Sequence, residues 1–270
     1  MKKVLAAALI CAVSSFAAWD YFPVKEAGKG EAKLGVQYDM PAEKTSSLGI
    51  NLAARYTVIE GLEVALLLNR GNGGFVVMKD APDAPSIPSI PVVPGVPVPA
   101  IPTAAAGAGK DAKGLNQPVI GVRYWLPLGL GFFADVALPF GSEKLVTKEP
   151  ALGLDAGAQY SIKLNEQLAI GSQAGVSLGF GDFDIGLGIA VEVDYSLGAI
   201  TPWLAIDFGT GLTKGDKQES SPADIGVEVG FGYNISDALY ANAYVHLGVA
   251  GDANKDNTPI TIGANVGTNF

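Results

Sequence analysis

The residue with the clearest potential for acid–base chemistry is His246, the single histidine of the 270-residue chain. An imidazole can exchange a proton with a neighbouring carboxylate, and Asp207 and Asp252 are the candidate partners. The surrounding stretch, YVHLGVA, has no serine two residues after the histidine. One histidine without a second ligand is also a poor metal site. The sequence therefore favours a wetted structural histidine and predicts neither an enzyme nor a bound metal or cofactor.

A second set of candidates consists of ionisable residues that share one side of alternating stretches. The bases come from the early part of the chain and most of the acids from the later part. Around a water-filled path, a basic wall opposite an acidic one would create a transverse field, acidic overall and so favourable to cations. The alternative is a set of interior ion pairs that keep the wall wetted and stable. The candidates are Lys33, Arg55, Glu63, Arg123, Asp135, Asp155, Glu192, Asp207, Glu228 and His246.

The segments that carry these residues alternate between bulky apolar residues and small or polar ones. The C-terminal stretch TPITIGANVGTNF shows the pattern, and a period of two is typical of a β-strand with two different faces. Twelve such segments predict an all-β fold, a single closed antiparallel transmembrane β-barrel. The expected strands cover residues 31–38, 47–58, 62–69, 117–126, 130–140, 151–162, 166–180, 183–195, 199–210, 223–234, 238–250 and 259–270.

The connections between these segments alternate in length. Turns of two or three residues, such as Glu60-Gly61 and Ser236-Asp237, alternate with connections that are mostly longer and charged. Barrels of the bacterial outer membrane have this asymmetry, with short turns on the periplasmic side and longer loops outside. The remaining tight turns are expected at Pro127-Leu128-Gly129, Leu164-Asn165 and Ser196-Leu197-Gly198, and the longer loops at 39–46, 70–116, 141–150, 211–222 and 251–258.

The residue types on the two faces decide which face meets water. One face is dominated by glycine and alanine, whereas the surface of a soluble barrel would carry Lys, Glu and Thr. The other face is bulky and almost without charge along the strand centres, which suits hydrocarbon. We therefore expect the bulky face outside and the glycine face around a narrow passage. Inward aromatic side chains could still close that passage: Phe133, Trp125, Trp203, Tyr240 and Tyr244.

Aromatic residues recur near the ends of the outward faces. Six descending strands each carry one near the turn side, and four ascending strands carry one near the loop side. Two belts of aromatics are expected where a barrel wall crosses the headgroup regions of a membrane. The predicted membrane-interface residues are Tyr38, Tyr56, Tyr124, Phe140, Tyr160, Phe180, Tyr195, Phe208, Tyr233 and Phe270.

The first seventeen residues have the features of an export signal. Lys2 and Lys3 precede an apolar core, and Ser15-Phe16-Ala17 resembles a cleavage site. We expect residues 1–17 to be a signal peptide and residues 18–270 to form the barrel. Because this leader holds two lysines, no acid and the only cysteine, its removal changes the net charge from −9 to −11 and leaves no thiol. Such an acidic chain is a poor partner for nucleic acid.

Residues 79–114 interrupt the strand pattern with a Pro/Ala/Gly-rich insertion. Its prolines at 82, 85, 88, 91, 94 and 97 recur every third residue, which matches one turn of polyproline II. A proline-rich segment cannot pair into a sheet, so we expect a long external loop. One interpretation of this loop is a solvated spacer. The alternative function of the protein is a structural or adhesion barrel with a closed lumen, whose external loop binds a partner.

The leader, the alternating strands and the terminal aromatic resemble bacterial outer-membrane β-barrels. In that family a C-terminal phenylalanine is read by the barrel assembly machinery, a role that the resemblance implies for Phe270. The stretches DVALPFGSEK and GLDAGAQYSIKLNEQLAIGSQAGV are similar to the transporter group of MetA-pathway phenol-degradation proteins. The predicted function is accordingly a narrow outer-membrane channel or transporter for small solutes, cation-favouring if open, with membrane lipid around it.

Overall fold

The computed structural model describes residues 26–40, 47–68, 76–77, 118–140, 152–180, 184–213, 224–250 and 260–270. The predicted leader 1–17 and the proline-rich insertion 79–114 lie outside these residues and stay predictions. No helix in the described part of the chain is long and apolar enough to cross a membrane.

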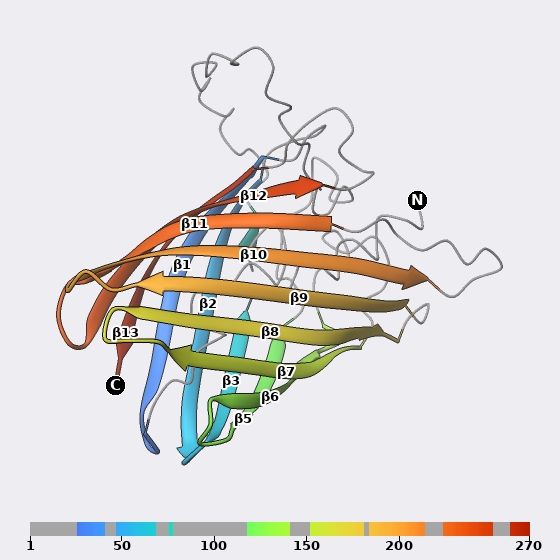
Figure 1. Ribbon diagram of the computed structural model, residues 1–270. Helices are drawn as coiled ribbons and strands as arrows, with labels where there is room; N and C mark the ends of the chain where they lie inside the picture. Colours follow the sequence, from blue (N-terminus) through green and yellow to red (C-terminus); the bar gives the residue numbers. More distant parts are fainter. Residues whose placement is uncertain are drawn as a thin grey trace, which may run out of the picture.

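Twelve antiparallel strands form one closed barrel, which confirms the predicted fold class. Each strand pairs with its neighbours in chain order, and the first strand pairs with the last to close the ring. Figure 1 shows the strands tilted around the barrel, with the tight hairpins gathered at one end. The strands are β1 (Gly30–Met40), β2 (Ser47–Ile59), β3 (Leu62–Leu68), β5 (Val119–Trp125), β6 (Leu130–Ala137), β7 (Gly153–Lys163), β8 (Leu168–Gly179), β9 (Asp184–Tyr195), β10 (Ile200–Thr213), β11 (Asp224–Asn234), β12 (Leu239–Ala250) and β13 (Ile260–Asn269).

A short additional strand, β4 (Val76–Val77), was not predicted. It pairs with Gly49 and Ile50 of β2, beyond the end of β3. It lies within residues 70–116, which the sequence predicts to be a loop. Two residues are too few for a periodic pattern, so a strand of this length cannot be predicted from alternation.

Strand β6 ends three residues earlier than predicted. The alternation suggested a strand to residue 140, but β6 stops at Ala137. Pro139 has no backbone N–H to donate to a ladder, so the strand cannot continue through it. Phe140 therefore lies beyond the strand. In contrast, β10 continues to Thr213, past the predicted end at residue 210.

The hairpin turns occur where the sequence places them, and specific residues fix their shape. Gly61, Gly129 and Gly198 have positive φ angles of 79°, 77° and 80°, a conformation that other residues rarely adopt. In the β7–β8 turn, the Asn165 side chain accepts hydrogen bonds from the backbone N–H groups of Gln167 and Leu168, both at 2.8 Å. These turns set the register of the strands that follow.

The terminal residue closes the ring next to the first strand. Phe270 N donates to Gly30 O at 3.0 Å, and Gly30 N donates to Phe270 O at 2.8 Å. Ten further residue pairs continue this register along β1 and β13. The barrel therefore has no open edge between its first and last strands, which removes the unpaired strand groups that promote aggregation.

Candidate functional site: the inner face of the barrel

The ten predicted lumen residues all project from the inner face of the barrel. Eight are buried, and Asp207 and His246 are partly exposed within it. Strand parity places them there, because alternate residues of a strand point to the same face. Their role in ion selectivity stays a prediction. The buried eight are Lys33, Arg55, Glu63, Arg123, Asp135, Asp155, Glu192 and Glu228.

One group of these residues forms an ion-pair network around Arg55. Its guanidinium lies 2.8 Å from the Glu31 carboxylate, on the residue directly opposite in β1. It also lies 3.7 Å from the Glu63 carboxylate of β3. Tyr240 of β12 donates a hydrogen bond to the second Glu31 oxygen. The network therefore connects β12, β1, β2 and β3 across the junction of the first and last strands.

The second buried arginine is paired on the adjacent part of the wall. Arg123 of β5 lies 3.2 Å from the Asp135 carboxylate of β6. Gly121 leaves the space for this pair, because a Cβ atom there would lie 2.3 Å from an Asp135 oxygen. Both arginines are thus matched with acids on neighbouring strands. On this side the arrangement is that of interior ion pairs rather than a basic wall.

Acidic groups dominate the wall formed by β9, β10 and β11. Glu192 and Glu228 both lie opposite Ala205, one on each side of it. The Trp203 indole donates to Glu228 at 3.1 Å. Asp194 follows on the same face of β9 and interacts with Glu192. This wall therefore retains several carboxylates that are not matched by an adjacent arginine or lysine in the strand register.

His246 joins this acidic wall through one of its two predicted partners. Its Nε2 atom lies 3.0 Å from Asp207 Oδ1, across the intervening strand β11. Gly226 of β11 makes the contact possible, because a Cβ atom there would lie 2.4 Å from the His246 ring. The other candidate partner, Asp252, lies outside the described residues. Within the described chain no group of three or more His, Cys, Asp or Glu residues could hold a metal ion.

Three inner-face acids were not selected from the sequence. Glu31 shares the parity of Lys33 at the start of a predicted strand, and Asp194 shares the parity of Glu192. Asp39 belongs to the expected loop 39–46, but β1 extends to Met40 and includes it. There Asp39 accepts hydrogen bonds from Gln37 at 2.7 Å and Thr261 at 2.8 Å. Strict use of parity could have identified the first two.

Inner-face glycines provide space for aromatic rings of neighbouring strands. A Cβ atom at Gly157 or Gly175 would lie 2.8 Å from the Phe133 ring, and one at Gly230 would lie 2.2 Å from Trp203. The same relation holds for Tyr240 over Gly267, Tyr244 over Gly263 and Trp125 over Gly131. Each ring therefore lies along the wall above an adjacent strand. The rings occupy the space above these glycines. The number of inner-face glycines therefore does not indicate how much of the lumen is open.

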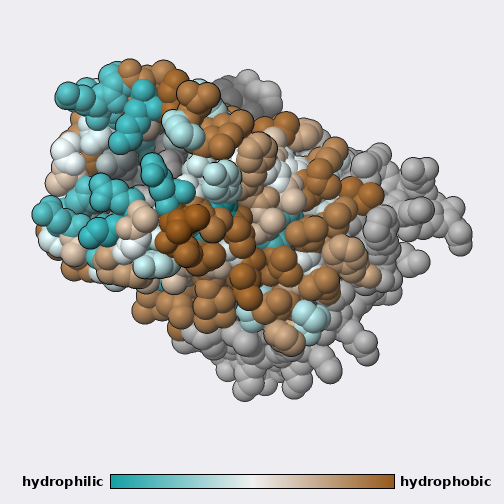
Figure 2. Space-filling model, turned by 90° about the horizontal axis from the view of Figure 1, so that it is seen from below, coloured by the Kyte–Doolittle hydropathy of each residue, from teal (hydrophilic) through white to brown (hydrophobic). Residues whose placement is uncertain are grey.

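The outer face is apolar and exposed along the strand centres. Alternate residues such as Val229 (55% exposed) and Phe231 (52%) project outward from β11. Figure 2 shows apolar residues over the strands and polar residues gathered at one end. Of the predicted membrane-interface aromatics, nine are exposed and Tyr38 is half-buried. Their position at a membrane surface stays a prediction.

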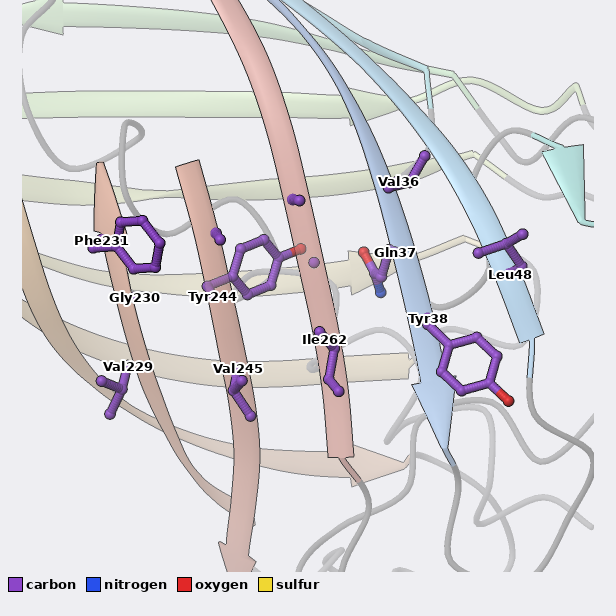
Figure 3. Close-up of a pocket in the computed structure, with 13 residues that line it drawn as sticks. Val36, Gln37, Tyr38, Leu48, Val229, Gly230, Phe231, Tyr244, Val245 and Ile262 are labelled. Atoms are coloured by element: carbon purple, nitrogen blue, oxygen red, sulfur yellow. The ribbon is translucent and has the colours of Figure 1, made fainter. Parts of the chain in front are cut away.

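The outer face also contains a shallow apolar hollow. It has a volume of about 480 Å³ and lies over β11, β12, β13, β1 and β2. Its lining includes Ala243 and Ala264, which pair across β12 and β13. Larger side chains such as Phe231 and Ile262 also line it (Figure 3). The hollow arises because two small residues occupy adjacent outward positions.

Comparison with known proteins supports the fold. No family model matches the sequence, and no curated protein matches it. Among solved structures, the chain is similar to an outer membrane channel from Pseudomonas putida F1, with a TM-score of 0.64 and 13% identity over 93% of this chain and 98% of that one. It is also similar to the NanC porin, with a TM-score of 0.53 and 9% identity over 87% and 98% of the respective chains. The narrower resemblance to the MetA-pathway group is not confirmed. The chain has the fold of bacterial outer-membrane β-barrels.

Proposed function

We propose that this protein is a narrow channel of the bacterial outer membrane that conducts small solutes and prefers cations. The observation that carries the proposal is the contrast between the two faces of one closed barrel. The outer face exposes apolar side chains, whereas the inner face buries charged ones. The similar structures include an outer membrane channel and a porin, which supports transport. In this proposal the outer face contacts lipid.

The expected preference for cations follows from how the inner charges are matched. Arg55 and Arg123 lie against carboxylates on neighbouring strands, so their charges are largely neutralised. Glu192, Asp194 and Glu228 lie together on the opposite part of the ring. An ion that passes this acidic wall therefore experiences a net negative potential, which attracts cations and repels anions.

The aromatic rings of the inner face are compatible with a passage. Phe133 and Trp203 lie over glycines of adjacent strands, and a ring held against the wall takes less of the cross-section than one that points at the axis. Twelve strands are intermediate between small barrels filled by their own side chains and large porins with wide aqueous channels. The proposal is therefore a narrow pathway.

Two further parts of the proposal concern export and assembly. Residues 1–17 would direct the chain across the inner membrane, and the barrel would then insert with lipid around it. Phe270, which is exposed and pairs with Gly30 at the closing strands, would be the residue read by the assembly machinery. The exposed aromatic residues near the strand ends would lie at the lipid headgroups.

Reversing two inner-face acids tests the proposed selectivity. Asp155→Lys combined with Glu228→Lys should lower the cation-to-anion permeability ratio at least about tenfold. A carboxylate about 6 Å from a cation in water contributes about 0.7 kcal/mol, so reversing the sign of one such group changes the energy of the cation by about 1.4 kcal/mol, which is one factor of ten for each residue. The measurement is the reversal potential in a planar bilayer under a salt gradient near 0.1 M, where screening is moderate.

The matched control carries the same change in net charge outside the lumen. Glu166→Lys combined with Asp237→Lys alters two exposed turn residues and should leave the permeability ratio close to that of the unaltered protein. An equal shift in both double variants would contradict a selectivity set by the inner wall. Correctly folded protein that gives no conductance steps would contradict the channel itself.

A further inference from the structure

Glu192 has an unusual environment on the inner face of β9. Its side chain is fully buried, with 0% of its surface exposed, and neither carboxylate oxygen accepts a hydrogen bond from a neutral or basic donor of the described residues. One oxygen of Asp194, two residues further along the same face, also accepts none. A buried carboxylate without a partner is energetically unfavourable, so this arrangement requires something to balance its charge.

The neighbouring residues explain why no protein donor reaches this pair. Glu192 lies between Ala205 of β10 and Gly171 of β8, which offer no side-chain donor. Asp194 lies between Ala169 and Trp203, but the indole N–H of Trp203 donates to Glu228 instead. The flanking strands thus offer these two carboxyl groups no side-chain donor.

The two carboxyl groups interact mainly with other acids. Glu192 and Asp194 are close enough for their carboxyl groups to contact each other, and Glu228 adds a further negative charge. Lys33 is the one base among the groups that act on Glu192. Two adjacent carboxylates without a donor between them must share a proton or hold a cation.

We propose that Glu192 and Asp194 form a binding site for a partly hydrated divalent cation on the inner wall. Two carboxylates supply two negative charges and hard oxygen ligands, which suit Mg²⁺ and Ca²⁺. Because no third acidic or histidine ligand converges there in the described residues, the ion keeps several waters. This inference rests on the proposed function in one respect, since an ion reaches the pair through the lumen.

Terbium luminescence provides a direct test, because Tb³⁺ replaces Ca²⁺ at oxygen sites and is excited by a nearby indole. Trp203 is the cross-strand neighbour of Asp194, so its indole is well placed to excite a terbium ion bound there. The refolded protein in detergent should bind Tb³⁺, and Ca²⁺ and Mg²⁺ should displace it at about 10⁻⁴–10⁻³ M, the range of weak calcium sites. Glu192→Gln and Asp194→Asn should each weaken this binding by tenfold or more.

Asp237→Asn is the control, since it removes a carboxylate from an exposed turn outside the lumen and should leave binding unchanged. Two results would overturn the site and indicate a shared proton instead. One is the absence of sensitised luminescence, and the other is terbium binding by the Glu192→Gln and Asp194→Asn variants that is as tight as in the unaltered protein. The measurement does not depend on conduction. Conductance without terbium binding would refute this inference alone, whereas terbium binding without conductance would refute the channel alone.

Discussion

Replacing Arg55 by methionine is expected to lower the free energy of unfolding of the barrel by about 3–5 kcal/mol. Arg55 is 6% exposed and lies against the carboxylates of Glu31 and Glu63. Its removal leaves buried carboxylates close together without their cation, which is more unfavourable than losing the pair as a whole. Reversible urea unfolding of the refolded protein in lipid vesicles, followed by tryptophan fluorescence, measures the change.

A triple variant separates this effect from a simple loss of packing. Arg55→Met combined with Glu31→Gln and Glu63→Gln removes the whole set of charges and keeps side chains of similar size. It should recover most of the lost stability, because replacing a complete buried ion pair is often close to neutral. The amide of a glutamine at position 31 can still accept the hydrogen bond from Tyr240. A triple variant less stable than Arg55→Met would contradict this explanation.

The second large effect is expected on the outer face. Val229→Arg should lower the free energy of unfolding in vesicles by about 2–4 kcal/mol, the usual penalty for arginine at the membrane midplane of a barrel. Val229 lies near the middle of β11 and is 55% exposed. The same urea titration measures the change. In a soluble barrel an exposed arginine at this position would be harmless or favourable.

Ile235→Arg is the matched control. Ile235 has the same parity as Val229 and is also exposed, but it lies just beyond the end of β11, next to the hairpin turn. Near the membrane surface the penalty for arginine falls to about 0–1 kcal/mol. The two variants should therefore differ by at least about 1 kcal/mol. Equal effects would contradict a membrane centred on the strands.

The strands and their faces could be predicted because the information is local. In β11 the inward residues Gly226, Glu228 and Gly230 alternate with Val227 and Val229, so the sequence of one strand is enough to assign both faces. The tight turns are equally local, since a glycine with positive φ or an asparagine cap defines them. The end of β6 was also predictable from Pro139, although the alternation alone suggested a longer strand.

The contacts between strands could not be predicted, because they depend on register. His246 contacts Asp207 across β11, and Tyr240 contacts Glu31 across β13. Such pairs are far apart in the sequence and meet only after the barrel has closed with a particular stagger. The hypothesis of a basic wall opposite an acidic wall places each charge around the ring by the order of its strand in the sequence. It takes no account of the partners that each charge meets on neighbouring strands. It missed Glu31, whose carboxylate neutralises Arg55.

The role of the inner-face glycines was interpreted incompletely for a related reason. A sequence shows that Gly157 and Gly175 have no side chain, but not that the Phe133 ring fills the space above them. The choice of small residues next to large ones lets each ring pack against the wall. Composition therefore indicated the inner face correctly, whereas the size of any passage depends on packing between strands.

The central claim is that the bulky face of the strands contacts lipid and the glycine-rich face surrounds water. Spin labels on single cysteines test it most directly, in the protein with its one native cysteine replaced by serine and reconstituted in vesicles. The five positions 187 to 191 of β9 are suitable, because a side chain that begins at Gly188 meets only an ordinary van der Waals contact, with Phe208 O at 3.9 Å. Collision rates with oxygen report exposure to lipid, and those with a water-soluble nickel complex report exposure to water.

The account predicts strict alternation along this segment. Labels at Leu187, Ile189 and Val191 should collide mainly with oxygen, and labels at Gly188 and Ala190 mainly with the nickel complex. Gly188 is the decisive inward position, since a Cβ atom there would have only Phe208 O within 4 Å, at 3.9 Å. The opposite phase, with nickel collisions at Leu187, Ile189 and Val191, would contradict the claim that the apolar face lies in the membrane.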